Sequence, residues 1–379
     1  MNFEKLELKN FRNFDSLTLQ LSPSINMFLG CNGQGKTNLL ESIYMLTHGE
    51  SFRPGPGDTF VRQGDKNLSR SAFVRGKVRI KNLQSDIEMR FENSAKRVFV
   101  DNKKSVQSRL TAQFPTILFS PDRLLAIKQG PESRRILIDQ LLVQHNQRNK
   151  QIIVDYIRVL RTRNRLLKDH LSKKIASDEL VKILESLNPS FLNIATELVL
   201  ARIESLQAIT PKFEDAMRFL NDSKSIETSI EYLVSEECAN SWNRAKIFDS
   251  LQKRAIALAK AEMASGSTLV GPHKHDIRIL FNGRDSRYYS SQGQQRALIL
   301  SFKMAQIVYH HEVYQCYPVL LLDDVMSELD VEKRSRLVEF LETVQAQILI
   351  TATDLDFSIN LNRDKIKVFH IESGRVSLA

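Results

Sequence analysis

The spacing of hydrophobic residues changes several times along the chain. Residues 1–30 alternate between apolar and polar positions and predict a strand, a turn and a second strand, which leads into a glycine-rich loop. Residues 39–46 continue directly as a helix. Alternation returns from about residue 68 to 106, where we expect antiparallel strands.

From residue 131 to about 265 the hydrophobic residues recur with helical spacing, and only Pro131, Pro189 and Pro211 interrupt it. Strands return at 276–281, and Asn282-Gly283 then predicts a hairpin whose second strand covers 287–289. The remaining pattern predicts a helix over 294–311, a buried strand over 317–325, a helix over 331–343, a strand over 347–351 and a hairpin over 367–379.

This order predicts an α/β nucleotide-binding head with a mixed sheet and an antiparallel β part, interrupted by a helical arm of domain size. We expect residues 1–130 to form the first half of the head, 131–268 the arm, and 269–379 the second half. The two halves must join in space because each lacks part of the expected site.

Composition adds a basic, globular character. The formal net charge is +10 and the isoelectric point about 9.4. Such an excess favours polyanionic partners but does not say which. The alternative is a soluble enzyme that is basic without binding a polyanion. The three cysteines lie far apart, so neither a zinc site nor a disulfide framework is indicated. The N-terminal segment lacks an apolar core, and no apolar run reaches the roughly 18 residues that cross a bilayer. We therefore expect a cytoplasmic protein without a membrane segment.

Residues 30–37, G-C-N-G-Q-G-K-T, have the spacing of a phosphate-binding loop between a strand and a helix. Glycines let backbone amides curl around phosphates, Lys36 would reach the β and γ phosphates, and the Thr37 hydroxyl would bind Mg²⁺. A chance glycine-rich turn is the alternative, and Cys31 has no evident redox role. The residues that we expect to bind ATP are Gly30, Cys31, Asn32, Gly33, Gln34, Gly35, Lys36, Thr37 and Asn38.

A second element is the apolar run 319–322, which ends in Asp323 and Asp324. Asp323 would hold Mg²⁺, through water, and Asp324 would orient or deprotonate the attacking water. We expect Asp324 and Lys36 to be the catalytic residues. A strand that simply ends in two solvated acids is the alternative.

The third element, S-S-Q-G-Q-Q-R over 290–296, resembles the signature loop of the ABC ATPase superfamily, in its DNA-repair branch. In that family the loop reaches across a dimer and contacts the γ-phosphate held by the other subunit. The resemblance assigns this role to Ser291, Gln292, Gly293 and Gln294. An ordinary helix N-cap is the alternative for such a serine.

Further segments narrow the resemblance to the RecF family, whose heads are similar to those of SMC proteins. Residues 8–13, L-K-N-F-R-N, resemble the family's opening, in which the arginine approaches the nucleotide; Arg12 would take that role. The other matching segments are Phe119-Ser120-Pro121-Asp122, Gly130-Pro131 with Arg134-Arg135, Gly271-Pro272-His273 and the D-loop-like Ser327-Glu328-Leu329-Asp330. Together they run from residue 8 to about 330.

The resemblance implies an ATP-dependent DNA-binding protein of recombinational repair, replication-fork recovery and the SOS response. An ATP-induced homodimer would clamp DNA at gaps or junctions and help to load a recombinase with RecO and RecR. Transporter relatives have Glu at the position of Asp324 and a switch histidine where Thr351-Ala352-Thr353-Asp354 falls. These departures favour slow, DNA-stimulated hydrolysis that resets a switch.

A basic stretch over 157–174 is the candidate DNA contact. A basic helix could follow phosphates, but the interspersed leucines favour core packing equally, with the charges merely solvated. A second cluster near 96–109 has the same ambiguity, and no base-reading motif is present. The candidate DNA-binding residues are Arg158, Arg161, Arg165 and Lys168.

Two other functions use the same phosphate loop. A phosphotransferase acting on a small molecule would need arginines near the phosphates, which Arg134 and Arg135 could supply, but would not need the signature segment. A transporter's nucleotide-binding subunit would need a surface for a membrane partner. The basic helical arm and the missing switch histidine argue against this function.

Overall fold

The computed structural model describes residues 1–53, 57–62, 71–92, 95–146, 148–223, 225–353 and 365–378, so that Asp354 of the expected switch segment lies outside the described residues. Contacts divide the chain into two compact units. The head unit comprises residues 1–125, 216–223 and 296–379, and the arm unit comprises 126–215 and 224–295. By these contacts residues 269–295, which we assigned to the second half of the head, group with the arm unit.

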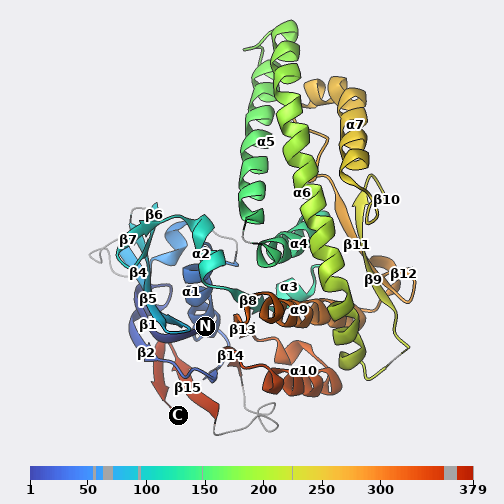
Figure 1. The fold of residues 1–379 in the computed structure, drawn as a ribbon. Coiled ribbons are helices and arrows are strands. Elements are labelled where there is room, and N and C mark those ends of the chain that lie inside the picture. Colours follow the sequence, from blue (N-terminus) through green and yellow to red (C-terminus); the bar gives the residue numbers. More distant parts are fainter. Residues whose placement is uncertain are drawn as a thin grey trace. The chain divides into compact units, whose positions relative to one another are not determined.

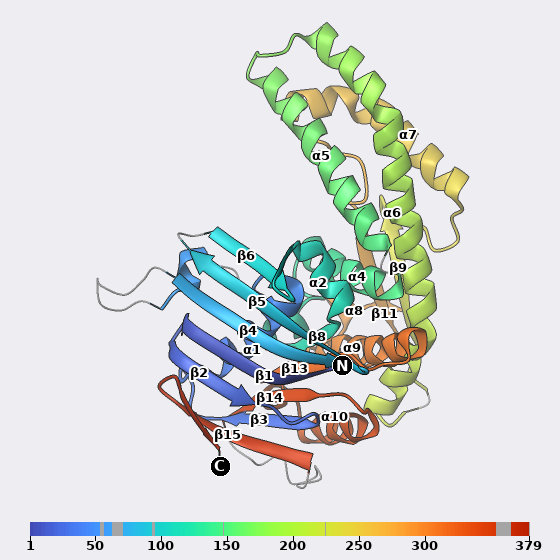
Figure 2. The same ribbon diagram turned by 60° about the vertical axis from the view of Figure 1, so that its left-hand side comes forward.

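The head unit contains an antiparallel sheet in the order β2-β1-β4-β5-β6-β7, which supports the strands expected over 68–106 (Figure 2). One face of this sheet is apolar because alternate residues of its strands are buried, as in the pattern iBiBiBiBei of β4. The strands are β1 (Asn2–Phe11), β2 (Phe14–Gln20), β4 (Ser71–Ile80), β5 (Leu83–Glu92), β6 (Ala95–Val100) and β7 (Lys103–Ser105).

The second sheet of the head unit is mixed, in the order β16-β15-β3-β14-β13-β8. Its central strands β3, β14 and β13 are parallel and buried at every position, which is typical of a sheet covered on both faces. The strands are β3 (Ile25–Leu29), β8 (Thr116–Phe119), β13 (Val319–Asp323), β14 (Ile348–Ala352), β15 (Ile366–Glu372) and β16 (Arg375–Leu378); β15 and β16 form the C-terminal hairpin.

Helix α1 (Lys36–His48) contacts β4 and β5 of the antiparallel sheet and β8, β13 and β14 of the mixed sheet. Its residues from Leu39 to Thr47 are buried, so this helix forms the centre of the head core. The other helices of the head unit are α2 (Gln107–Gln113), α3 (Pro121–Leu124), α10 (Val331–Thr343), the short 3₁₀ helices η1 (Gly57–Phe60) and η2 (Met326–Glu328), and α9 (Gln292–Tyr314) from its fifth residue on.

The arm unit consists of helices and one small sheet in the order β10-β9-β11-β12 (Figure 1). Its helices are α4 (Pro131–His145), α5 (Asn149–Leu171), α6 (Ser177–Leu220) up to residue 215, α7 (Arg244–Ser265) and α8 (Ser286–Tyr289). Its strands are β9 (Thr228–Val234), β10 (Glu237–Cys238), β11 (Asp276–Phe281) and β12 (Arg284–Asp285). Among the described residues, no helix is both long and apolar enough to cross a membrane.

Two local expectations were wrong. Strands β9 and β10 lie inside the stretch expected to be helical, because residues 228–232 alternate in burial and residues 228–233 pair with β11. The second strand of the hairpin ends at Asp285, and residues 286–289 form α8 instead. The Asp285 side chain accepts a hydrogen bond from the amide of Arg287 and so caps that helical turn.

Helix α6 runs for 44 residues without stopping at Pro189 or Pro211. Both prolines are exposed, so the carbonyl that each leaves without an intrahelical partner can be hydrated. A proline therefore did not mark a helix end in this stretch.

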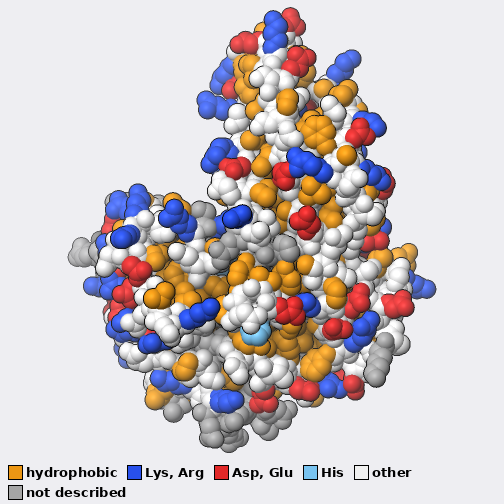
Figure 3. Space-filling view, in the orientation of Figure 1, with side chains coloured by type: hydrophobic (Ala, Val, Ile, Leu, Met, Phe, Trp, Pro, Cys, Tyr) orange, Lys and Arg blue, Asp and Glu red, His pale blue; other side chains and the backbone are white. Residues whose placement is uncertain are grey.

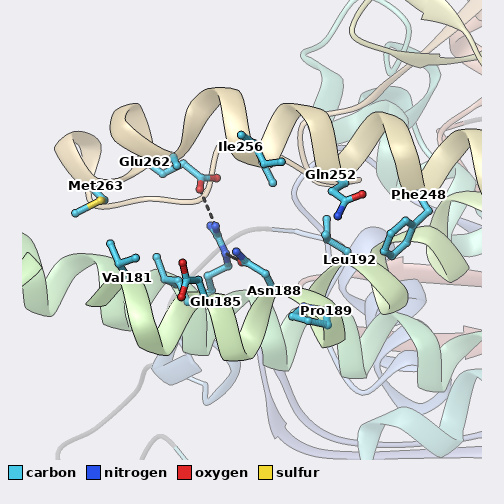
Figure 4. Close-up of a pocket in the computed structure, with 14 residues that line it drawn as sticks. Val181, Glu185, Asn188, Pro189, Leu192, Phe248, Gln252, Ile256, Glu262 and Met263 are labelled. Carbon is cyan, nitrogen blue, oxygen red and sulfur yellow. Dashed lines mark hydrogen bonds and ion pairs between the residues drawn. The ribbon is translucent and has the colours of Figure 1, made fainter. Parts of the chain in front are cut away.

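An apolar hollow of about 430 Å³ lies between α6 and α7 (Figure 4). The side chains of Arg163 and Glu262 line it and form an ion pair in which Nη2 lies 2.7 Å from Oε2. These side chains are 3% and 1% exposed, and Arg163 also donates to the Thr268 hydroxyl. The pair ties α5 to α7, and Arg163 therefore belongs to the arm core.

Replacing Glu262 with Gln should destabilise the protein by about 3 kcal/mol, because the guanidinium of Arg163 would remain buried without its counter-charge. Thermal or urea unfolding measures this change. Asp249→Asn on the same helix is the matched control, because Asp249 pairs with Lys253 at a largely exposed position. Equal stability of the two variants would show that the buried pair does not stabilise the arm unit.

Candidate functional site

The phosphate loop follows β3 and closes tightly against the C-terminal hairpin. A Cβ atom at Gly30 would come within 2.3 Å of the Ile371 carbonyl oxygen, and Gly35 has φ of +116°. Both positions therefore require glycine. Gly35 is the N-cap of α1, so the exposed loop leads directly into the positive end of that helix.

Three residues that the sequence analysis did not single out brace this loop. The Asn13 side chain donates to the Gln34 carbonyl at 2.8 Å, and the Gly374 amide donates to the same oxygen at 3.1 Å. The amide of Ser373 donates to the Gln34 side chain. Asn13 belongs to the L-K-N-F-R-N segment that resembles the RecF family, so the resemblance could have pointed to it. No pattern in the sequence linked residues 373–374 to the loop.

Thr37 and Asp323, expected to bind Mg²⁺, are brought together. The Thr37 hydroxyl donates to Asp323 Oδ1 at 3.0 Å, and the Thr351 hydroxyl donates to the same oxygen at 2.9 Å. Burial raises the pKa of Asp323, while these two hydrogen bonds and the charge of Arg53 act in the opposite direction. Lys36 Nζ lies 3.0 Å from the Cys31 carbonyl oxygen within the loop.

Asp324 adopts a left-handed conformation with φ of 50°, which turns the chain immediately after β13. Its amide donates to the Thr351 hydroxyl at 2.9 Å, and its carbonyl accepts from the Ser327 hydroxyl at 2.8 Å. Asp324 is half-exposed, and its charge acts on Asp323. In the following D-loop-like segment, Glu328 forms an ion pair with Arg296 of α9 at 2.6 Å.

Arg12 lies in the turn between β1 and β2 and is paired with α1. Its guanidinium donates to both carboxylate oxygens of Glu41, at 2.7 and 2.9 Å, and to the Thr59 carbonyl. The approach of Arg12 to a nucleotide stays a prediction. Arg53 was not identified from the sequence; it donates to the Asn38 side chain at 2.9 Å, and its charge acts on Asp323.

Residues 290–295 of the signature segment belong to the arm unit, and Ser291, Gln292 and Gly293 are exposed. Ser291 forms a reciprocal capping box with Gln294: the Gln294 amide donates to the serine hydroxyl oxygen, and the Ser291 amide donates to the glutamine side chain. The serine hydroxyl still has its own proton to donate. Ser291 is thus a helix N-cap, and this role leaves its hydroxyl able to meet an anion.

Other segments that resemble the family are internal to the arm unit. His273 contacts the Tyr156 hydroxyl and the Thr268 carbonyl, and burial lowers its pKa to about 4. Arg134 is buried and donates to both carboxylate oxygens of Asp276 at 2.7 and 2.8 Å. Both residues therefore hold the arm unit's own elements together.

The four candidate DNA-binding residues Arg158, Arg161, Arg165 and Lys168 are all exposed on α5. Their spacing of three, four and three residues places them on one face of that helix. Figure 3 shows basic side chains along the edge of the arm formed by α5. The helix packs on the arm core through Arg163, while these four residues face solvent, and their contact with DNA stays a prediction.

Thr351→Val should raise the pKa of Asp323 further, because it removes a hydrogen bond that favours the charged carboxylate. Carboxyl chemical shifts of ¹³C-labelled aspartate, followed against pH, measure this change. Thr343→Val at the exposed end of α10 should leave the titration unchanged, since that hydroxyl donates to the Phe340 carbonyl. An unshifted Asp323 in Thr351→Val would contradict the role given to Thr351.

Comparison with known proteins matches residues 2–377 to the family described as the RecF/RecN/SMC N terminal domain. The DNA replication and repair protein RecF of Lactobacillus gasseri is 35% identical over 386 residues, covering 100% of this chain and 99% of that protein. The RecF protein of Heliobacterium modesticaldum is 32% identical, again with 100% and 99% coverage.

Solved structures agree with this result. The recombination mediator protein RecF with ATP, described in the RecFOR pathway, has a TM-score of 0.86 at 29% identity, covering 100% of this chain and 97% of that chain. An Smc head domain of Pyrococcus furiosus has a TM-score of 0.56 at 16% identity, covering 100% of this chain and 95% of that chain, and shares the fold alone. The fold, the phosphate loop joined to Asp323 and these matches together place the chain in the RecF family of ABC-type ATPase heads.

Proposed function

We propose that this protein is an ATP-dependent DNA-binding switch of recombinational repair and replication-fork recovery. The observation that carries the proposal is the joined Thr37 and Asp323 pair beside an exposed glycine loop, on a chain whose relatives over its full length are replication and repair proteins. The phosphates of ATP would lie against the loop amides and the first turn of α1. We place this activity in the cytoplasm.

Mg²⁺ fits the donors at this site. The Thr37 hydroxyl and the Asp323 carboxylate offer the hard oxygen ligands that Mg²⁺ prefers, and both lie at the end of the loop where β and γ phosphates would sit. When bound, the ion would neutralise phosphate charge. Thr351 would hold the Asp323 carboxylate in place, since its hydroxyl donates to the same oxygen.

Asp324 is the candidate base for the attacking water, and Lys36 the candidate partner of the phosphates. An aspartate is one methylene shorter than the glutamate of fast ABC enzymes, which fits weak hydrolysis stimulated by DNA. Slow turnover suits a protein that changes state once per binding event.

The signature turn supports assembly into an ATP-dependent homodimer. Ser291 and Gly293 are exposed at the positive end of α9, so they can meet the γ-phosphate bound by a second subunit. ATP favours the closed dimer only through this contact, because a ligand shifts an equilibrium by its difference in affinity for the two states.

Ser291→Arg should bind ATP with the affinity of the wild-type monomer and fail to form ATP-dependent dimers, because a large side chain would occupy the place of the γ-phosphate. Analytical ultracentrifugation with and without ATP measures dimer formation. Asp324→Asn is the control, because it leaves the signature turn intact and should accumulate closed dimers. Normal dimers of Ser291→Arg would rule out the shared site.

DNA would contact the basic face of α5 through its phosphates, in double-stranded, gapped or single-stranded form and without reading sequence. RecO and RecR are the proposed partners in loading a recombinase, since the similar RecF structures are described in the RecFOR pathway. We also propose that it clamps DNA at gaps or junctions and acts in the SOS response.

Replacing Arg158, Arg161, Arg165 and Lys168 together with Ala should weaken DNA binding and flatten its salt dependence. If all four residues contact phosphates, the slope of log K against log salt should fall in magnitude by about 3. Fluorescence anisotropy across a salt series measures the slope. The control replaces four other exposed residues with the same total charge, on α6 and α7: Lys182, Lys253, Arg254 and Lys260. If both variants lose the same DNA affinity and the same salt dependence, α5 has no specific role in binding DNA.

The phosphotransferase alternative is weaker. It needs arginines beside the phosphates, and of the two candidates Arg134 is bound by Asp276 and Arg135 donates to the His275 carbonyl within the arm unit. Turnover that increases with protein concentration and DNA would separate the two functions in favour of the switch.

A further inference from the structure

Two neighbouring tyrosines immediately before the signature turn face solvent. Tyr288 and Tyr289 are 75% and 69% exposed, on α8 in the arm unit. Large aromatic side chains this exposed are enriched where proteins bind other molecules, because their rings supply contact area at low conformational cost. Neither ring contributes to the arm core.

Each ring lies beside an arginine. The Arg287 guanidinium lies 5.3 Å from the centre of the Tyr288 ring, and that of Arg284 lies 6.0 Å from the Tyr289 ring. Arginine and tyrosine are the residue types that most often dominate the energetics of protein interfaces. The four side chains Arg284, Arg287, Tyr288 and Tyr289 are called the aromatic patch below.

Two half-buried carboxylates hold Arg287 of the patch in place. Arg287 donates to Asp285 and, at 3.0 Å, to Asp276 Oδ2, which also accepts from the buried Arg134 at 2.7 Å. Because Asp276 is shared by two guanidinium groups, Arg287 is fixed on the arm unit and Tyr288 lies over an immobilised cation. A guanidinium held in this way loses little entropy when it binds.

The patch and the signature turn are held as one piece. The Gln295 side chain is buried and donates to the carbonyls of Ser286 at 2.8 Å and Ser290 at 3.3 Å, on either side of the two tyrosines. Whatever meets Ser291 therefore also comes close to Tyr289, two residues earlier in the chain. A surface that docks on the turn would cover the patch.

We propose that the aromatic patch is a dimer-forming surface that binds a second copy of this chain next to the shared nucleotide. The inference rests on the proposed function, because it takes the signature turn to meet another subunit. The patch supplies binding area that does not depend on the phosphates, and the signature turn supplies the dependence on ATP. Stacking on nucleic acid bases is the other use of such residues, and the test separates the two.

The test is the double variant Tyr288→Ala/Tyr289→Ala, studied as the full chain with a non-hydrolysable ATP analogue. The dimer should weaken on the order of tenfold or more in sedimentation, as at an interface hot spot. Affinity for the analogue should stay unchanged, because the phosphate loop belongs to the head unit. Tyr289→Phe should dimerise like the wild type, since the ring remains.

Ile256→Ala is the matched control, because Ile256 is 73% exposed on α7 of the same unit. If the double variant dimerises normally while Ser291→Arg does not, the patch is not a dimer surface, and the proposed function stays intact. If Ser291→Arg also dimerises, the shared site itself fails. Loss of DNA binding with dimer formation unchanged would assign the tyrosines to base stacking and overturn the inference.

Discussion

The candidate site depends on one carboxylate oxygen, Oδ1 of Asp323, which accepts hydrogen bonds from Thr37 and Thr351. These three residues come from the end of β13, the start of α1 and the end of β14. Because parallel strands end at the same edge of a sheet, residues far apart in sequence meet at this atom. The buried strands fix the position of the acid, and the two hydroxyls stabilise its charge against the cost of burial.

The arm unit depends on buried ion pairs instead. Arg134 with Asp276, Arg163 with Glu262 and Arg202 with Asp139 each connect segments that are distant in sequence. Such pairs contribute little net stability compared with apolar packing, but each leaves a costly unpaired charge when its partner is absent. They specify which elements of the arm unit pack on one another, and Asp276 also holds Arg287, in the turn before Ser291.

Much of the head could be predicted from the sequence because its elements have strong local signals. The phosphate loop between β3 and α1, the apolar strand ending at Asp323, and the C-terminal hairpin all follow from spacing and turn residues. The strand β9 was missed because it is short and lies between long helices. Thr351 and Arg53 were missed because their roles depend on which segments the fold brings beside Asp323, and no local pattern carries that information.

The phosphate loop is braced from both ends of the polypeptide, by Asn13 and by the amides of Ser373 and Gly374. During synthesis the loop emerges from the ribosome more than three hundred residues before its second brace. A nascent or truncated chain that lacks the final hairpin therefore has the whole glycine motif but only half of its support. The loop would then be fully braced only after residues 373 and 374 have been synthesised, so the order of synthesis delays its folded geometry.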